Sequence, residues 1–110
     1  MPFTIRVAFA AGGGGSADDV TIYAAAAPFA FRIIDVTVLV ATAVGGSTAQ
    51  LRDTTGGGGA TLSSSLSTAA TGTVRNADTA TRTVASAGSV YLRRSDNGVA
   101  GEIIIKAVRT

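Results

Sequence analysis

The chain has 110 residues, nine basic and seven acidic side chains, and a formal net charge of +2. This length predicts one domain over residues 1–110. The net charge is small and the arginines are scattered, which argues against a nucleic-acid partner. The absence of cysteine excludes disulfides and thiolate chemistry. A membrane-spanning helix needs about 18 consecutive apolar residues, and the sequence has no run of that length.

The N-terminal quarter predicts two strands around a loop. From Phe3 to Ala10, apolar and polar side chains alternate, which is typical of a half-buried strand. Four consecutive glycines from Gly12 to Gly15 predict a flexible loop. A short second strand is expected from Val20 to Ala24, with Tyr23 on its outward face.

The longest expected strand runs from Phe29 to Val44, and β-branched residues dominate its middle. Its side chains are mostly apolar on both faces, which predicts the central strand of a sandwich, covered on both sides. Uniform alternation places one row of side chains on each face. One row is Ile34, Val36, Val38 and Val40; the other is Phe31, Ile33, Asp35, Thr37 and Leu39.

The middle of the chain carries two further glycine signals. Gly45-Gly46 predicts a tight hairpin into a returning strand from Thr48 to Asp53. Gly56 to Gly59 predicts a second flexible loop. The spacing of Leu62 and Leu66 permits one helical turn, but extended or irregular structure fits equally well, because Ser and Thr compete with the helix backbone.

The C-terminal third predicts four strands. They are expected over Thr73 to Asn76, Thr79 to Ala85, Ser89 to Arg94, and Gly101 to Arg109. Asp96-Asn97-Gly98 predicts a type I′ hairpin between the last two. About eight strands with no helix of ordinary length predict an all-β fold, an antiparallel β-sandwich or jelly roll.

Asp35 is the carboxylate that interrupts an apolar strand. Burying a charge costs several kcal/mol unless it is paired, so we expect a structural ion pair with an arginine of an adjacent strand or subunit. The candidates are Arg32, Arg52 and Arg94, and the sequence does not choose among them. Catalysis by Asp35 is the alternative reading.

No catalytic constellation, metal site or cofactor site is predicted. The chain lacks histidine, the usual general base and commonest metal ligand, which disfavours a cupin-type enzyme. The glycine runs lack the lysine and following helix of a phosphate-binding loop. Adjacent Asp18 and Asp19 lack the ligand spacing of a calcium site, so a solvated loop is expected there.

Outward aromatic and apolar side chains are the candidates for an interface. Aromatic residues on exposed strand faces mark protein contacts, and sugars also stack on them. The candidate interface residues are Phe3, Tyr23, Phe29, Phe31, Tyr91, Ile104 and Val108.

Two segments carry a family resemblance: FRIIDVTVLVATAVGG in the long central strand, and VYLRRSDNGVAGEIIIKAVR at the end of the chain. With the polar Thr/Ser/Gly/Ala-rich middle, they resemble small head-decoration and fibre-like structural proteins of tailed bacteriophages. The resemblance implies a virion protein without turnover, made in the host cytoplasm. It further implies a homotrimer on the outer capsid surface, with the major capsid protein lattice as partner.

Two other functions stay open at the level of sequence. One is a phage tail or fibre receptor-binding or carbohydrate-binding module that uses Tyr23, Tyr91 and the loops. The other is a small hydrolase, which requires two carboxylates about 5–10 Å apart in one cleft.

Overall fold

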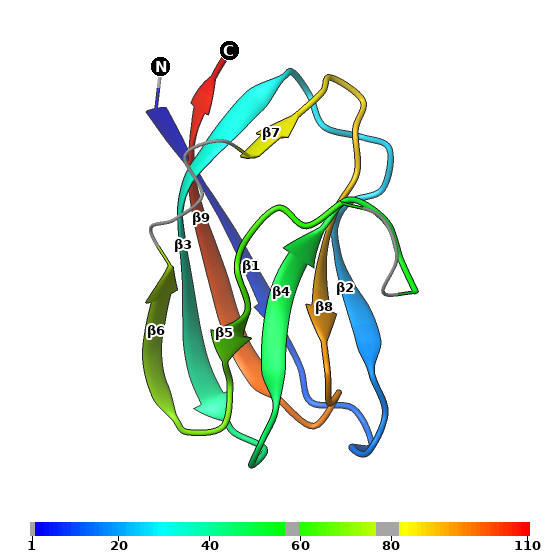
Figure 1. The fold of residues 1–110 in the computed structure, drawn as a ribbon, viewed down its shortest axis with the longest axis vertical. Helices are drawn as coiled ribbons and strands as arrows, with labels where there is room; N and C mark the ends of the chain where they lie inside the picture. Colours follow the sequence, from blue (N-terminus) through cyan, green and yellow to red (C-terminus); the bar gives the residue numbers. More distant parts are fainter. Residues whose placement is uncertain (1, 57–59, 77–81) are drawn as a thin grey trace.

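The computed structural model describes residues 2–56, 60–76 and 82–110, and these form nine strands in two antiparallel sheets without a helix (Figure 1). No part of the described chain forms a helix that could cross a membrane. The strands are β1 Pro2–Phe9, β2 Asp18–Tyr23, β3 Phe31–Thr42, β4 Thr48–Arg52, β5 Leu66–Ser67, β6 Gly72–Asn76, β7 Arg82–Val84, β8 Val90–Arg94 and β9 Ala100–Arg109.

The strand order is that of a jelly roll. The larger sheet runs β1-β9-β3-β6, with β7 also paired to β3, and the smaller sheet runs β2-β8-β4-β5. Antiparallel pairing joins β1 to β9, β2 to β8, β3 to β6 and β4 to β5. These pairs are those of one long hairpin whose turn is the β4–β5 connection. The hairpin wraps around itself, so that its pairs alternate between the two sheets. The predicted all-β sandwich or jelly roll is therefore confirmed.

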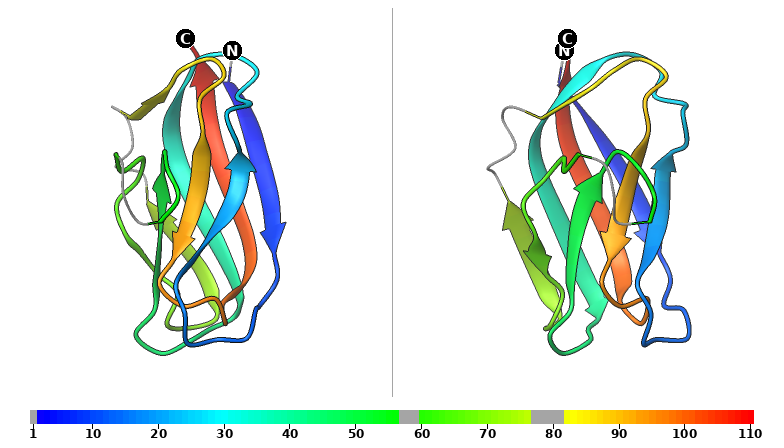
Figure 2. Two further views of the ribbon diagram at one scale, coloured as in Figure 1. Left: turned by 90° about the vertical axis from the view of Figure 1, so that its right-hand side faces the viewer. Right: turned by 45° about the vertical axis from the view of Figure 1, so that its right-hand side comes forward.

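The two sheets face each other (Figure 2), and the core lies between them. Strand alternation predicts this arrangement for β8 and β9, and the inward rows there are fully buried. The apolar residues with no exposure in the described chain are Ile33, Val36, Val38, Leu51, Val90, Leu92, Ile103, Ile105 and Ala107.

A β-bulge in β3 corrects the predicted faces of the central strand. Opposite β9, the register shifts between Ile33 and Asp35. Phe31 and Ile33 are therefore buried on the same side as Val36, although uniform alternation assigned them to the opposite face. The strand is central, as predicted, but Thr37 and Leu39 on its outer face are half-exposed rather than covered.

Both predicted hairpins are wrong, because the turns connect different sheets. Gly46 has a φ of 73°, and Ser47 donates its backbone N–H to the carbonyl of Val44, yet β3 and β4 lie in separate sheets. The turn at Asn97-Gly98 likewise connects β8 of the smaller sheet to β9 of the larger one. Neither residue has the positive φ of a type I′ turn.

The weaker predictions have mixed outcomes. The segment from Leu62 to Leu66 is irregular rather than helical, with bends at Leu62 and Ser63, and Leu66 begins β5. β7 is shorter than the predicted strand from Thr79 to Ala85, of which residues 79–81 lie outside the described residues. The predicted glycine loop at 56–59 is described only at Gly56, which has a φ of 77°.

Candidate interaction surfaces

Four of the candidate interface residues form one aromatic cluster at the end of the sandwich that holds both termini (Figure 1). The ring of Phe3 meets the rings of Phe29 and Phe31 edge to face, with centroids 5.2 and 5.4 Å apart. The ring of Tyr23 lies 6.3 Å from that of Phe31. The guanidinium of Arg109 stacks over Phe29 at 4.5 Å, a cation–π contact.

The cluster corrects two of the interface predictions. Phe31 is only 1% exposed and is a core residue of the single chain. Tyr23 packs against the core instead of facing outward, because the register of β2 shifts between Thr21 and Tyr23. Phe3 and Phe29 remain half-exposed, so the accessible part of the cluster is smaller than predicted.

The outer face of the larger sheet holds Ile104 and Val108, both half-buried. In the strand register, Ile104 lies between Arg6 of β1 and Thr37 of β3. Charged groups surround this apolar centre. They are the ion pairs Arg6–Glu102 and Asp35–Arg75, and the exposed side chain of Lys106.

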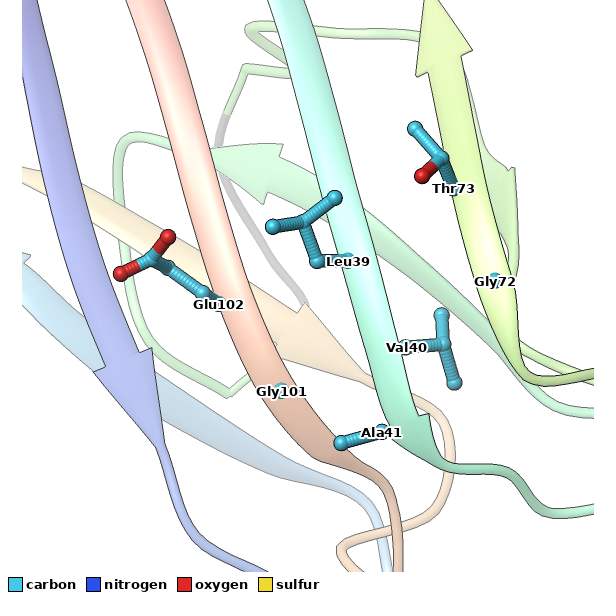
Figure 3. Close-up of a pocket in the computed structure, with 7 residues that line it drawn as sticks. All are labelled: Leu39, Val40, Ala41, Gly72, Thr73, Gly101 and Glu102. Carbon is cyan, nitrogen blue, oxygen red and sulfur yellow. The ribbon is translucent and has the colours of Figure 1, made fainter.

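A shallow hollow of about 520 Å³ lies on the larger sheet beside the end of β3. Gly72 and Gly101 flank Val40 in one cross-strand row, so two positions of that row have no side chain. In Figure 3, Leu39 stands between Thr73 and Glu102 at this hollow. Glu102 is its single carboxylate and already pairs with Arg6, so the hollow has no second carboxylate for hydrolysis.

A second hollow of about 350 Å³ lies near the β7–β8 connection and also contains one carboxylate, that of Asp53. One oxygen of that carboxylate accepts a hydrogen bond from the backbone N–H of Ala60 at 2.8 Å. Among the residues that the structure describes, neither hollow therefore has the pair of carboxylates that the hydrolase hypothesis requires.

Asp35 forms an ion pair, with a partner that was not predicted. The Nε–H of Arg75 donates to its carboxylate at 2.8 Å, and the Asp35 residue is 6% exposed. Arg75 lies on β6 opposite Thr37, two positions beyond Asp35. Of the predicted partners, Arg32 is exposed elsewhere on β3, and Arg52 and Arg94 belong to the smaller sheet.

Arg94 is the most deeply buried arginine of the described chain, at 5% exposure. Its guanidinium donates to both carboxylate oxygens of Asp18, at 2.7 and 2.6 Å, and to the carbonyls of Ala10 and Val99, at 2.8 and 2.6 Å. It also lies 5.5 Å from the ring of Phe9. Sequence reasoning missed this role, although alternation from Val90 through Leu92 places position 94 on the inward face.

Asp18 and Asp19 belong to β2 rather than to the predicted solvated loop. Each carboxylate pairs with an arginine of β8, Asp18 with Arg94 and Asp19 with Arg93 at 3.0 Å. No group of three or more potential metal ligands occurs among the described residues.

Tyr91 lies half-buried on the outer face of the smaller sheet, in register with Thr21 and Arg52. Tyr23 belongs to the aromatic cluster instead, so the structure does not bring the two tyrosines together as a platform for a sugar ring. No family model, curated protein or solved structure matches this chain.

Proposed function

We propose that this chain is a structural virion protein, a capsid decoration protein that assembles as a homo-oligomer on the head surface and has no turnover. The observation that supports this most is the jelly-roll strand order. Viral capsid domains, lectins and cupins are the established uses of this architecture. A shared fold suggests a function only by analogy. The chemistry of the candidate sites must therefore decide between a capsid protein, a lectin and a cupin.

Site chemistry disfavours the two other uses of the fold. A cupin uses histidines as metal ligands, and the chain has none. A lectin needs a stacking platform, but Tyr23 packs against the core while Tyr91 lies on the outer face of its sheet, and the sequence has no tryptophan. The most buried charged groups, Asp35 and Arg94, are held in structural ion pairs. Protein contact is therefore the simplest function for the apolar residues on the surface.

The surface supports protein contact in two places. The outer face of the larger sheet has an apolar centre around Ile104 and Val108 within a charged border, which is the anatomy of a protein interface. Phe3 and Phe29 present half-exposed rings at the end of the sandwich. The proposed partners are other copies of the chain, a homotrimer by the bacteriophage resemblance, and the major capsid protein lattice.

The test is binding to heads assembled without this chain. Purified protein is mixed with such heads and pelleted, and the account expects saturable binding at a fixed ratio to the major capsid protein. Ile104→Lys is expected to weaken binding, whereas Thr21→Lys on the opposite sheet leaves it unchanged. Absence of binding to heads, combined with saturable binding to glycans or to host cells, would replace the proposal with the receptor-binding alternative.

A further inference from the structure

The described sheets have five edge strands, and four of them are short or irregular, among them β7 with three residues. β5 has two residues, β6 has five and begins at Gly72 with a φ of 127°, and β2 contains a bulge before Tyr23. These features discourage pairing with another strand. β1 has eight residues in continuous register with β9 and no bulge, so its outer edge presents a regular row of unpaired backbone groups.

Nothing in the side chains of β1 protects that edge. A charged side chain on an edge strand usually discourages association, but Arg6, the only charge on β1, is ion-paired to Glu102 of its own sheet. Pro2 is at the first position, where it leaves the rest of the edge free.

The core is also open along this edge. Phe3, Ile5 and Val7 face inward yet are only half-buried, whereas Ile103 and Ile105 on the adjacent strand have no exposure. The inward residues of β2, the facing edge strand, are half-buried as well. Figure 2 (left) shows this side of the sandwich, with β1 and β2 toward the viewer. At the other side of the sandwich, β5 and β6 contact each other.

We propose that the β1 edge is an interface between two copies of this chain, in which β1 pairs antiparallel with β1 of a second copy around a two-fold axis at Ile5. Unpaired backbone groups beside exposed apolar side chains require an extended strand as partner. A two-fold contact uses the same patch twice, so the patch must complement itself. The sequence of β1 meets this condition.

The register follows from β1 itself. With Ile5 opposite its own copy, Phe3 lies opposite Val7 and Thr4 lies opposite Arg6, so all residues from Pro2 to Ala8 pair. Apolar residues then share the core face and polar residues share the outer face. A shift of one residue would place inward side chains opposite outward ones.

The neighbouring even registers are worse. Centring the axis on Arg6 sets two guanidiniums directly opposite each other, which destabilises a strand pair. Centring it on Thr4 shortens the overlap to the segment from Pro2 to Arg6. In the proposed register the two arginines are diagonal neighbours, and Glu102 of each copy neutralises its own Arg6.

The contact does not depend on the proposed virion function. It is also distinct from the three-fold contact implied by the bacteriophage resemblance, because a two-fold axis joins copies in pairs. A dimer that ignores capsids would leave this inference standing and overturn the proposed function. A capsid-binding trimer with a free β1 edge would do the reverse.

The first experiment measures the solution mass of the wild-type chain and two variants by sedimentation velocity. The wild-type chain is expected at two copies of its 10.9 kDa, or another even number. Ile5→Lys places two ammonium groups opposite each other and is expected to halve the mass. Val74→Lys, at a half-buried inward position of the opposite edge strand β6, is expected to leave the mass unchanged.

The second experiment detects the contact without the Ile5→Lys variant, whose loss of mass could also result from misfolding. The chain has no cysteine, so Ile5→Cys adds a single thiol at the proposed axis. Directly opposed residues of antiparallel strands lie within disulfide reach. Ile5→Cys is expected to form a covalent dimer on mild oxidation, and Val74→Cys is not. A wild-type mass of one or three chains, or equal cross-linking by both variants, would overturn the proposal.

Discussion

Replacing Arg94 with alanine is expected to destabilise the fold more than any other single loss of charge. The guanidinium joins four parts of the chain: β8, Asp18 of β2, the carbonyl of Ala10 after β1, and the carbonyl of Val99 before β9. Alanine would leave both carbonyls and the Asp18 carboxylate without this donor. It would also remove the cation from the ring of Phe9.

The size of the loss follows from burial. The Arg94 side chain is 6% exposed and that of Asp18 is 36% exposed, so the first is almost fully desolvated and the second only in part. Removing one partner of a buried pair costs about 3–5 kcal/mol, and water around Asp18 places the expected loss at the lower end of this range, about 3 kcal/mol. Since a domain of this size has about 5–15 kcal/mol of total stability, the variant would fold only marginally. At about 4 °C per kcal/mol, the melting temperature would fall by roughly 12 °C.

Urea and thermal unfolding followed by circular dichroism measure this effect. Arg94→Lys keeps the charge but lacks the planar fork that holds both oxygens of Asp18, so an intermediate loss is expected. Lys106→Ala, an exposed cation of the outer face, serves as the control and is expected to change stability by less than about 0.5 kcal/mol. An Arg94→Ala variant within about 0.5 kcal/mol of wild type, the range of ordinary surface substitutions, would refute the reasoning.

Two further substitutions test close contacts of the larger sheet. Gly101→Ala would place a Cβ 1.9 Å from the carbonyl oxygen of Leu39, so a loss of about 2 kcal/mol or more is expected by urea unfolding. Gly13→Ala meets nothing within 4 Å and should be neutral; equal losses in both would contradict the argument. Arg75→Ala leaves the buried carboxylate of Asp35 without its cation and is expected to cost about 1–3 kcal/mol, whereas an unchanged midpoint would show that the ion pair contributes nothing.

The strands themselves could be predicted because alternation is a local property of the sequence. β1, β8 and β9 follow the expected faces, with Leu92 and Ile105 fully buried. The strand pairings contain three register shifts, at Ile34, Ala41 and Ile22, and the shifts at Ile34 and Ile22 changed the predicted faces. Neither the shift at Ile34 nor the one at Ile22 has a glycine or proline to mark it, so nothing local predicted that Phe31 and Tyr23 would turn into the core.

Strand partners could not be predicted, because they depend on the whole roll. A turn such as Asn97-Gly98 connects neighbours in sequence, and whether it joins them in one sheet or across two is decided by which strands pair elsewhere. The same limit applies to Asp35, whose partner Arg75 comes from a short strand 40 residues away. The burial of Arg94 could have been predicted, because alternation from Val90 through Leu92 places that arginine among the inward side chains.

The direct test of the account is to image heads assembled with and without this chain by electron cryomicroscopy. The account predicts additional density on the outer surface, repeated with the symmetry of the capsid lattice, in units that fit a jelly roll of 37 × 24 × 19 Å. Heads that look the same with and without the chain, or density confined to the tail, would contradict it.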